Sequence, residues 1–213
     1  MARRTKEDAL ATRQRLLDAA ECLFQARGVS ATSLNDIAAA AGATRGAVYW
    51  HFHDKGDLIN AMMERATLPL EHALACAAAG DDALGSLRDA ILGSMKKIVD
   101  DPGTRRVFEV ATHKVEYVDS LCAVRQRHLR VSAQCLGIMQ KALRTAARQR
   151  KVRLSTPSKT AAYGLYSIAD GLIQNWLLDA GQFDLVQVTR GVLRAYFDGL
   201  GFGAAAPATS RPA

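Results

Sequence analysis

The sequence predicts an all-α protein, and three observations support that prediction. Alanine is abundant, proline is scarce at 5 residues, and alternating patterns of β-branched residues are almost absent. The 213 residues are 49% hydrophobic, which is enough for a globular core and excludes a disordered chain. We expect about nine helices in two groups, a short N-terminal group and a larger C-terminal one.

The first helix is expected over residues 10–27. Apolar residues recur there at helical spacing up to Phe24, and Gly28 then ends the helix. The basic residues before it, including Arg3 and Arg4, have two open interpretations: a mobile arm that follows a DNA groove, or a solvated tail.

Two short helices follow, joined by a tight turn. Ser33 and Asp36 form a capping-box pattern at the start of the second helix, which ends at Gly42. Thr44 caps the third helix, which ends near Phe52. This arrangement over residues 33–52 predicts a helix-turn-helix, since glycine permits the turn. Its inward-facing side chains are expected to be Ile37, Val48 and Phe52, packed with Phe24 and Leu58.

Longer helices fill the rest of the chain. Asp54 caps a fourth helix that Pro69 is expected to kink or break, and Pro102-Gly103 is expected to be a loop. Ser155-Thr156-Pro157 predicts a helix start, with proline in the first turn. The expected ranges after the fourth helix are 83–101, 104–117, 119–150, 157–179 and 184–200.

Charge favours an anionic partner, and the cysteines argue against a metal site. The net charge is +7 and the pI about 9.5, although many proteins are basic for solubility alone. The basic helix over 119–150 is interpreted mainly as a solvated face. The four cysteines show no CxxC or other zinc spacing, so we expect buried free thiols, no metal, no cofactor and a reducing, cytoplasmic location without a membrane segment.

The segment TSLNDIAAAAGATRGAVYWHFHDKGDLI closely resembles the DNA-binding segment of TetR-family repressors. The start MARRTKEDALATR and the run TRGAVYWHF resemble the AcrR and TtgR subgroup, which represses multidrug efflux pumps. The resemblance is dense over residues 1–65 and continues through TRRVFEVATHKVEY and DGLIQNWLL. It implies a DNA-binding domain over 1–54 with a linking helix from 55, and a helical ligand-binding and dimerisation domain over 55–201. The low complexity of GAAAPATSRPA predicts a disordered tail over 202–213.

The resemblance also assigns roles in DNA binding. Arg45 is the candidate for a base contact, because guanidinium pairs bidentately with guanine. Tyr49, His51 and Lys55 resemble phosphate-binding side chains. Core packing is the alternative for the two aromatic residues of the third helix, and a helix C-cap is the alternative for the histidine. The full set is Ser33, Thr44, Arg45, Gly46, Tyr49, Trp50, His51 and Lys55.

The last two helices predict a homodimer, which would bind a palindromic or pseudo-palindromic operator. Their apolar stripes are wider than one core needs, although packing against the preceding helices is the alternative explanation. The expected interface residues are Leu165, Leu172, Trp176, Val188, Val192 and Tyr196.

A small hydrophobic or drug-like effector is expected in the larger domain. Asp170 is the polar candidate, because an acid on an apolar stripe needs a ligand or a basic partner. For Met95 and Met139, packing in the core is the alternative to lining the effector site. The candidate lining residues are Leu92, Met95, Ile98, Val99, Phe108, Thr112, Cys135, Ile138, Met139, Tyr166, Asp170 and Ile173.

The expected function is therefore a sequence-specific bacterial repressor of an RND-type multidrug efflux operon, released from DNA by its effector. The alternative is a related repressor or activator of a metabolic operon with a different effector. An enzyme is not expected, since no GxSxG or HExxH motif occurs, and His51 and His53 fall in the DNA-binding segment.

Overall fold

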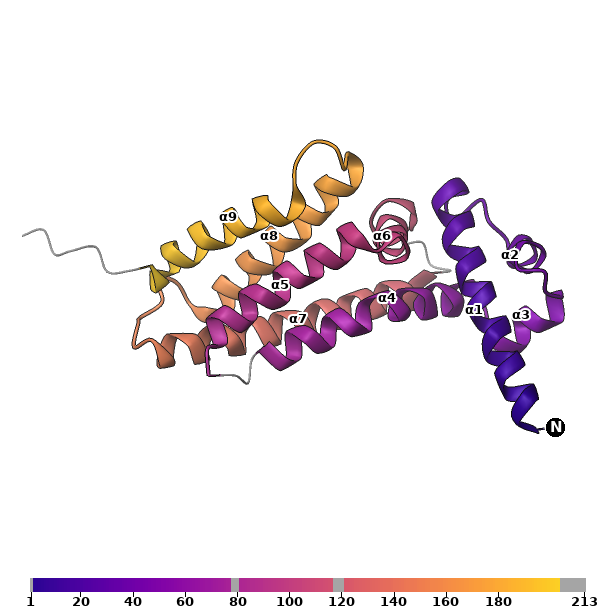
Figure 1. The fold of residues 1–213 in the computed structure, drawn as a ribbon, viewed down its shortest axis with the longest axis horizontal. Coiled ribbons are helices and arrows are strands. Elements are labelled where there is room, and N and C mark those ends of the chain that lie inside the picture. The colour runs from indigo at the N-terminus through magenta and orange to yellow at the C-terminus, as the bar shows by residue number, and fades with distance from the viewer. Residues whose placement is uncertain (1, 78–80, 117–120, 204–213) are drawn as a thin grey trace, which may run out of the picture. The chain divides into compact units, whose positions relative to one another are not determined.

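The computed structural model describes residues 2–77, 81–116 and 121–203, and these form nine α-helices with no β-strand among them (Figure 1). The all-α prediction is confirmed. The helices are α1 (Ala2–Arg27), α2 (Leu34–Ala40), α3 (Arg45–His51), α4 (Lys55–Ala77), α5 (Ala83–Asp100), α6 (Pro102–Glu109), α7 (Cys122–Gln149), α8 (Ser158–Leu178) and α9 (Leu185–Phe197). Short π-helical segments, Val110–Lys114 and Asp198–Phe202, extend α6 and α9.

The chain forms two compact units. Unit 1 comprises Met1–Glu71 and Lys97–Ala133, and unit 2 comprises His72–Lys96 and Gln134–Ala213. The predicted domain boundaries remain a prediction. Most of the predicted tail, residues 204–213, lies outside the described residues.

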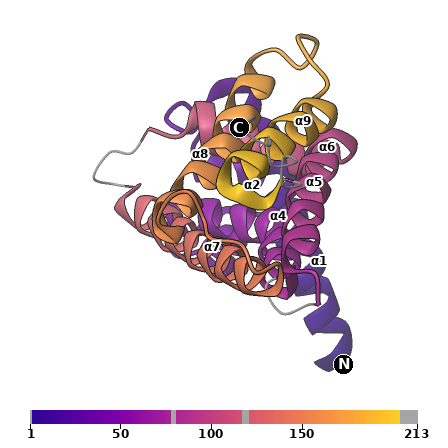
Figure 2. The ribbon, with the colours of Figure 1, turned by 90° about the vertical axis from the view of Figure 1, so that its left-hand side faces the viewer.

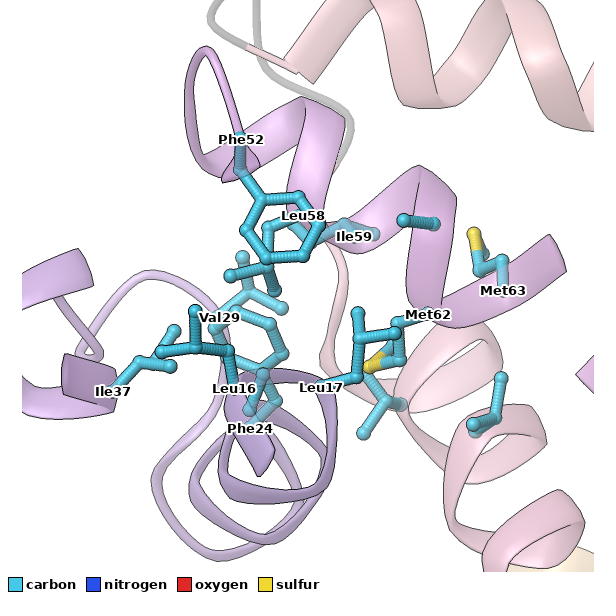
Figure 3. Close-up of a cluster of buried hydrophobic side chains, with 14 of the residues drawn as sticks. Leu16, Leu17, Phe24, Val29, Ile37, Phe52, Leu58, Ile59, Met62 and Met63 are labelled. Carbon is cyan, nitrogen blue, oxygen red and sulfur yellow. The ribbon is translucent and has the colours of Figure 1, made fainter. Parts of the chain in front are cut away.

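The core of unit 1 joins α1 to the two short helices and to the start of α4. Phe24, Ile37, Phe52 and Leu58 converge there and are at most 1% exposed (Figure 3). Val48 of α3 is equally buried. The predicted inward-facing set is confirmed, and its burial fixes which side of α3 remains free.

Two proline predictions need correction. Helix α4 continues through Pro69, so the predicted break is wrong, while the alternative of a kink stays a prediction. Pro102 is the first residue of α6 rather than part of a loop, because the Asp101 carboxylate accepts hydrogen bonds from the Gly103 N–H (3.1 Å) and the Thr104 hydroxyl (2.8 Å). Proline suits this position, where its missing N–H costs nothing. The ion pair with Lys97 and these hydrogen bonds lower the pKa of Asp101 to about 2.

Other helix ends also differ from the prediction. Helix α1 begins at Ala2, so the polar segment with Arg3 and Arg4 has a helical backbone. Helix α8 begins at Ser158, with Pro157 before its first turn and no side-chain cap. The expected cap at Ser155 is wrong, because its hydroxyl donates to the Gly199 carbonyl oxygen instead (2.9 Å).

In unit 2, α8 and α9 lie side by side (Figures 1 and 2). The Tyr196 hydroxyl of α9 donates to the Ala161 carbonyl oxygen of α8 at 2.8 Å. A Cβ on Gly164 would come within 2.3 Å of that hydroxyl oxygen, so only glycine leaves room for the ring. Burial raises the pKa of Tyr196. The ring therefore holds the two helices together within one chain.

The cysteine prediction is partly wrong. None of the four cysteines forms a disulfide, but Cys22, Cys76 and Cys122 are exposed and Cys135 is half-buried. Because none of them is fully buried, they do not act as small core residues.

Candidate nucleic-acid interface

The turn into the candidate interface is built by a capping box and one glycine. The Ser33 N–H donates to the Asp36 carboxylate at 2.8 Å, and the Asp36 N–H donates back to the serine hydroxyl oxygen at 3.2 Å. The hydrogen bonds from Ser33 lower the pKa of Asp36. Gly42 has φ +62°, a left-handed conformation that side chains strain, and the Ala43 N–H then bonds to the Ala38 carbonyl (2.9 Å).

Helix α3 starts immediately after this turn. The Thr44 hydroxyl oxygen accepts the Ala47 N–H at 3.2 Å, which confirms the predicted cap. The same hydroxyl still has its own hydrogen to donate. Thr44, Arg45 and Gly46 are all exposed, so the first turn of α3 is open on its outer side.

The outer face of α3 carries large side chains that the fold leaves uncovered. Tyr49 is 49% exposed and Trp50 is 72% exposed, so the alternative that these two rings pack in the core is wrong. The Arg45 guanidinium lies 5.5 Å from the centre of the Tyr49 ring, a cation–π contact. Arg45 has no acidic partner among the described residues. A planar cation and two aromatic rings therefore share one surface.

His51 and Arg13 lie at the far end of the same surface. The His51 ring meets Trp50 edge-on, with centroids 4.5 Å apart. Burial first, and the charge of Arg13 second, lower the pKa of His51 below its usual value, so the imidazole is neutral at pH 7 and has one N–H to donate. Arg13 of α1 lies over the Phe52 ring at 5.1 Å. Sequence reasoning missed Arg13; its only signal was the cluster of cations in residues 1–15.

Two other predicted residues already have structural partners. The Lys55 ammonium donates to the Val29 carbonyl oxygen (2.9 Å) and the Thr32 carbonyl oxygen (3.0 Å), between α1 and α2. One of its three N–H groups remains for another acceptor. The Ser33 hydroxyl donates to the Asp36 carboxylate at 2.5 Å. Their DNA contacts remain predictions, and both residues also hold the helix-turn-helix in shape.

An ion cluster inside unit 1 anchors α1, which packs against the helix-turn-helix. Glu21 is 3% exposed and pairs with Arg65 of α4 and, at 3.8 Å, with Arg106 of α6. Arg65 also binds Asp18 at 2.7 Å. Burial raises the pKa of Glu21, while the hydrogen bond and charge of Arg65 act in the opposite direction. The cluster ties three helices of unit 1 together.

The predicted effector residues are divided between the two units. Ile98, Val99, Phe108 and Thr112 belong to unit 1, and the other eight belong to unit 2. Within unit 2, Met95 and Met139 are buried, as the core alternative expected. The Asp170 carboxylate accepts a hydrogen bond from the Gln174 amide at 2.5 Å, and it has no ion pair with a described residue.

The predicted dimer residues fall into two groups. Leu165 is fully buried and Trp176 is 4% exposed, so these two pack inside their own unit and offer a partner almost no surface. Tyr196 is tied to α8, as described above. Leu172, Val188 and Val192 are half-buried. Sequence reasoning missed the exposed Tyr163 and Leu178, whose signal was an apolar residue near each end of α8.

Among the described residues there is no group of three or more His, Cys, Asp or Glu side chains that could hold a metal ion. None of the described helices combines the length and hydrophobicity that crossing a bilayer requires.

Two family models match the chain. Residues 16–62 match "Bacterial regulatory proteins, tetR family", which covers the helix-turn-helix. Residues 82–202 match "MAATS-type transcriptional repressor, C-terminal region". Together they account for most of both compact units.

Characterised relatives agree along nearly the whole chain. The "HTH-type transcriptional regulator TtgR" of Pseudomonas putida is 37% identical over 87% of this chain and 90% of its own length. The crystal structure of NalD, "the secondary repressor of MexAB-OprM multidrug efflux pump in Pseudomonas aeruginosa", is 34% identical with a TM-score of 0.84, covering 91% of this chain and 98% of that one. A SmeT–triclosan complex is 29% identical with a TM-score of 0.81, covering 95% and 99%.

Proposed function

The chain belongs to the TetR family and is a DNA-binding transcriptional repressor rather than an enzyme, and we propose that it represses a multidrug efflux pump operon. The pump is of the RND type, and a small hydrophobic effector releases the repressor from its operator. The efflux role follows from relatives such as NalD, whose target is named as a multidrug efflux pump.

The observation that carries the proposed contact with DNA is the outer face of α3. Val48, on the inner face, is fully buried. Arg45, Tyr49 and Trp50, on the outer face, are exposed to solvent. In the proposed complex, Arg45 reads a base edge in the major groove and Gly46 lets the backbone approach. Tyr49, His51 and the remaining N–H of Lys55 bind phosphates.

A second copy of the chain supplies the second α3. One recognition helix binds too weakly to define a site, and a two-fold pair contacts half-sites about 34–36 Å apart or a multiple of that distance. We assign the pairing surface to α8 and α9. Tyr163 (51% exposed) and Leu178 (71% exposed) on α8 support it, together with the half-buried Val188 and Val192 on α9.

The effector acts by differential binding. It prefers a conformation of the dimer whose two α3 helices are spaced wrongly for DNA, and a tenfold release requires a difference of about 1.4 kcal/mol. Triclosan is the first effector to test, since the related SmeT has been crystallised with it.

The test is binding to the DNA upstream of the chain's own gene, measured by fluorescence anisotropy and footprinting at physiological salt. We expect a protected palindrome and an affinity at least about 10³-fold above that for scrambled duplex. Triclosan, antibiotics and plant phenolics are then added to the complex, and at least one should release the DNA. Equal binding to scrambled duplex would refute the DNA contacts. Flanking genes of metabolism instead of a pump would favour the metabolic alternative.

A further inference from the structure

Unit 2 contains a groove that lies away from the DNA contacts and from nearly all of the predicted effector residues. It has a volume of about 730 Å³ and lies between the first half of α5, the flank of α9 and the segment after it. Figure 2 shows α9 with α8 on one side and α5 on the other. Of the twelve predicted effector residues, only Leu92 lines this groove.

Two arginines of the groove have no partner. Arg190 and Arg194 lie one helical turn apart on α9, are exposed, and form no hydrogen bond or ion pair with any residue that the structure describes. Two unpaired guanidiniums on one wall repel each other and attract an anion. A carboxylate that contacts both would remove this repulsion.

Two further arginines at the groove are held by carboxylates. Arg88 binds Asp89 at 2.9 Å, and Arg150 binds Asp82 at 3.0 Å. Four arginines line the groove against two acids, Asp89 and Asp198, so its charge is positive even with every lining acid ionised.

The remaining lining of the groove is apolar. Leu84, Phe197 and Phe202 are each less than 9% exposed, and Leu92 is half-buried. The rings of Phe197 and Phe202 meet edge to face, with centroids 6.4 Å apart. A ligand that fits both parts therefore needs an apolar body and an anionic head.

We propose that this groove binds an amphipathic organic carboxylate, with the carboxylate on Arg190 and Arg194 and the apolar body against Phe197, Phe202 and Leu92. Bidentate guanidinium–carboxylate pairing supplies the specificity, and burial of the apolar body supplies much of the affinity. The groove shares only Leu92 with the predicted effector residues, and the proposal does not depend on which operon the protein controls.

The groove remains accessible in the proposed dimer. Residues two positions apart on an α-helix point about 200° apart, so Arg190 and Arg194 lie on the side of α9 opposite Val188, Val192 and Tyr196. A partner chain that packs on the proposed face does not cover the two guanidiniums.

Isothermal titration of the full-length protein with decanoate, below its micelle concentration, tests the proposal. We expect R190Q/R194Q to weaken decanoate binding by about tenfold or more. The matched control is R144Q/R148Q: these arginines are also one turn apart and exposed in unit 2, but on α7 and outside the groove. It removes the same two charges and should change the affinity by less than about twofold.

Two further measurements keep the result interpretable. D89N removes a lining acid and frees Arg88, so it should tighten decanoate binding by a fewfold even if the glutamine variant folds poorly. Decanol, which has the same chain without the charge, should bind R190Q/R194Q and the unaltered protein alike. Equal losses in both double variants, no loss in either, or no decanoate binding to the unaltered protein would overturn the proposal.

Discussion

Unit 1 contains two groups of charged residues with opposite environments. In the first, Glu21 is buried between Arg65 and Arg106, and every member of the group has an oppositely charged partner. In the second, Arg45 stands on the outer face of α3 beside Tyr49, exposed and without an acid among the described residues. Both groups are formed by helices of the same unit, yet they serve different purposes.

The difference shows how to separate charges that hold the fold from charges that meet a partner. A buried carboxylate destabilises the fold unless cations compensate its charge. Removing one member of such a group therefore leaves the remaining charges buried without an opposite charge. An exposed cation on an aromatic ring costs the fold little and stays available to a phosphate or a base. We therefore expect substitutions in the first group to change the free energy of unfolding, and substitutions in the second to change DNA binding.

The largest effect is expected for E21A. Arg106 is half-buried, with a buried Nε that has no hydrogen-bond partner, and it would lose its only acidic partner among the described residues. The free energy of unfolding should therefore fall by about 3 kcal/mol. Urea denaturation measures it. D18A is the control, since that carboxylate binds the same Arg65 but is 65% exposed, and it should cost about 1 kcal/mol or less. Equal losses in the two variants would show that burial is not what distinguishes the pair.

The next effect is expected for R45A, on binding alone. The affinity for the operator should fall by about 1–3 kcal/mol, or roughly 5- to 150-fold, with relaxed specificity at the contacted base pair. The free energy of unfolding should stay within about 0.5 kcal/mol of its original value. Anisotropy titrations on the operator and on single-base variants measure the first effect. A uniform loss on every sequence would make Arg45 a phosphate contact.

K55A tests a residue that is expected both to stabilise the fold and to contact DNA. Its ammonium holds two carbonyl oxygens between α1 and α2, so its removal should cost about 1–2 kcal/mol of stability. DNA binding should weaken alike on all sequences, and the slope of log K against log salt should fall by about 1. If stability falls and the salt slope does not change, Lys55 has only a structural role.

The smallest effect is expected for D101N, and it depends on pH. The pKa of Asp101 is lowered to about 2, so its ion pair adds stability above the ordinary aspartate pKa, and this is lost as the pH falls toward 2. Because Asp101 is 37% exposed, solvent screening limits the gain to about 1 kcal/mol. D101N should be less stable by that amount at neutral pH and match the original protein at about pH 2. In a K97Q background the same substitution should have little effect.

Much of the fold was predictable because its signals are local. Ser33 with Asp36, Gly42 and Thr44 each set a turn or a cap by short-range hydrogen bonds, and all lie where the sequence placed them. The apolar spacing of α1 and α3 likewise predicted the buried side of each helix. The exposed face of α3 follows from the same periodicity.

Features that depend on tertiary partners were not predictable. The sequence around Asp101 and Pro102 fits either a loop or the capped start of a helix. The hydrogen bonds of the Asp101 carboxylate show that it is a helix start. Leu165 and Trp176 fit a wide stripe, but the stripe does not show which of its residues the same chain covers. The second role of Lys55 depends on carbonyl groups 26 and 23 residues away, which no local pattern reveals.

The left-handed turn at Gly42 bears on attempts to retarget the repressor to a new operator. In a library of substitutions at Gly42, most variants would be destabilised by backbone strain whatever their effect on DNA binding. Diversity is better placed at Arg45, Tyr49 and Trp50, whose side chains lie outside the core, so new recognition codes can be screened on an undamaged scaffold.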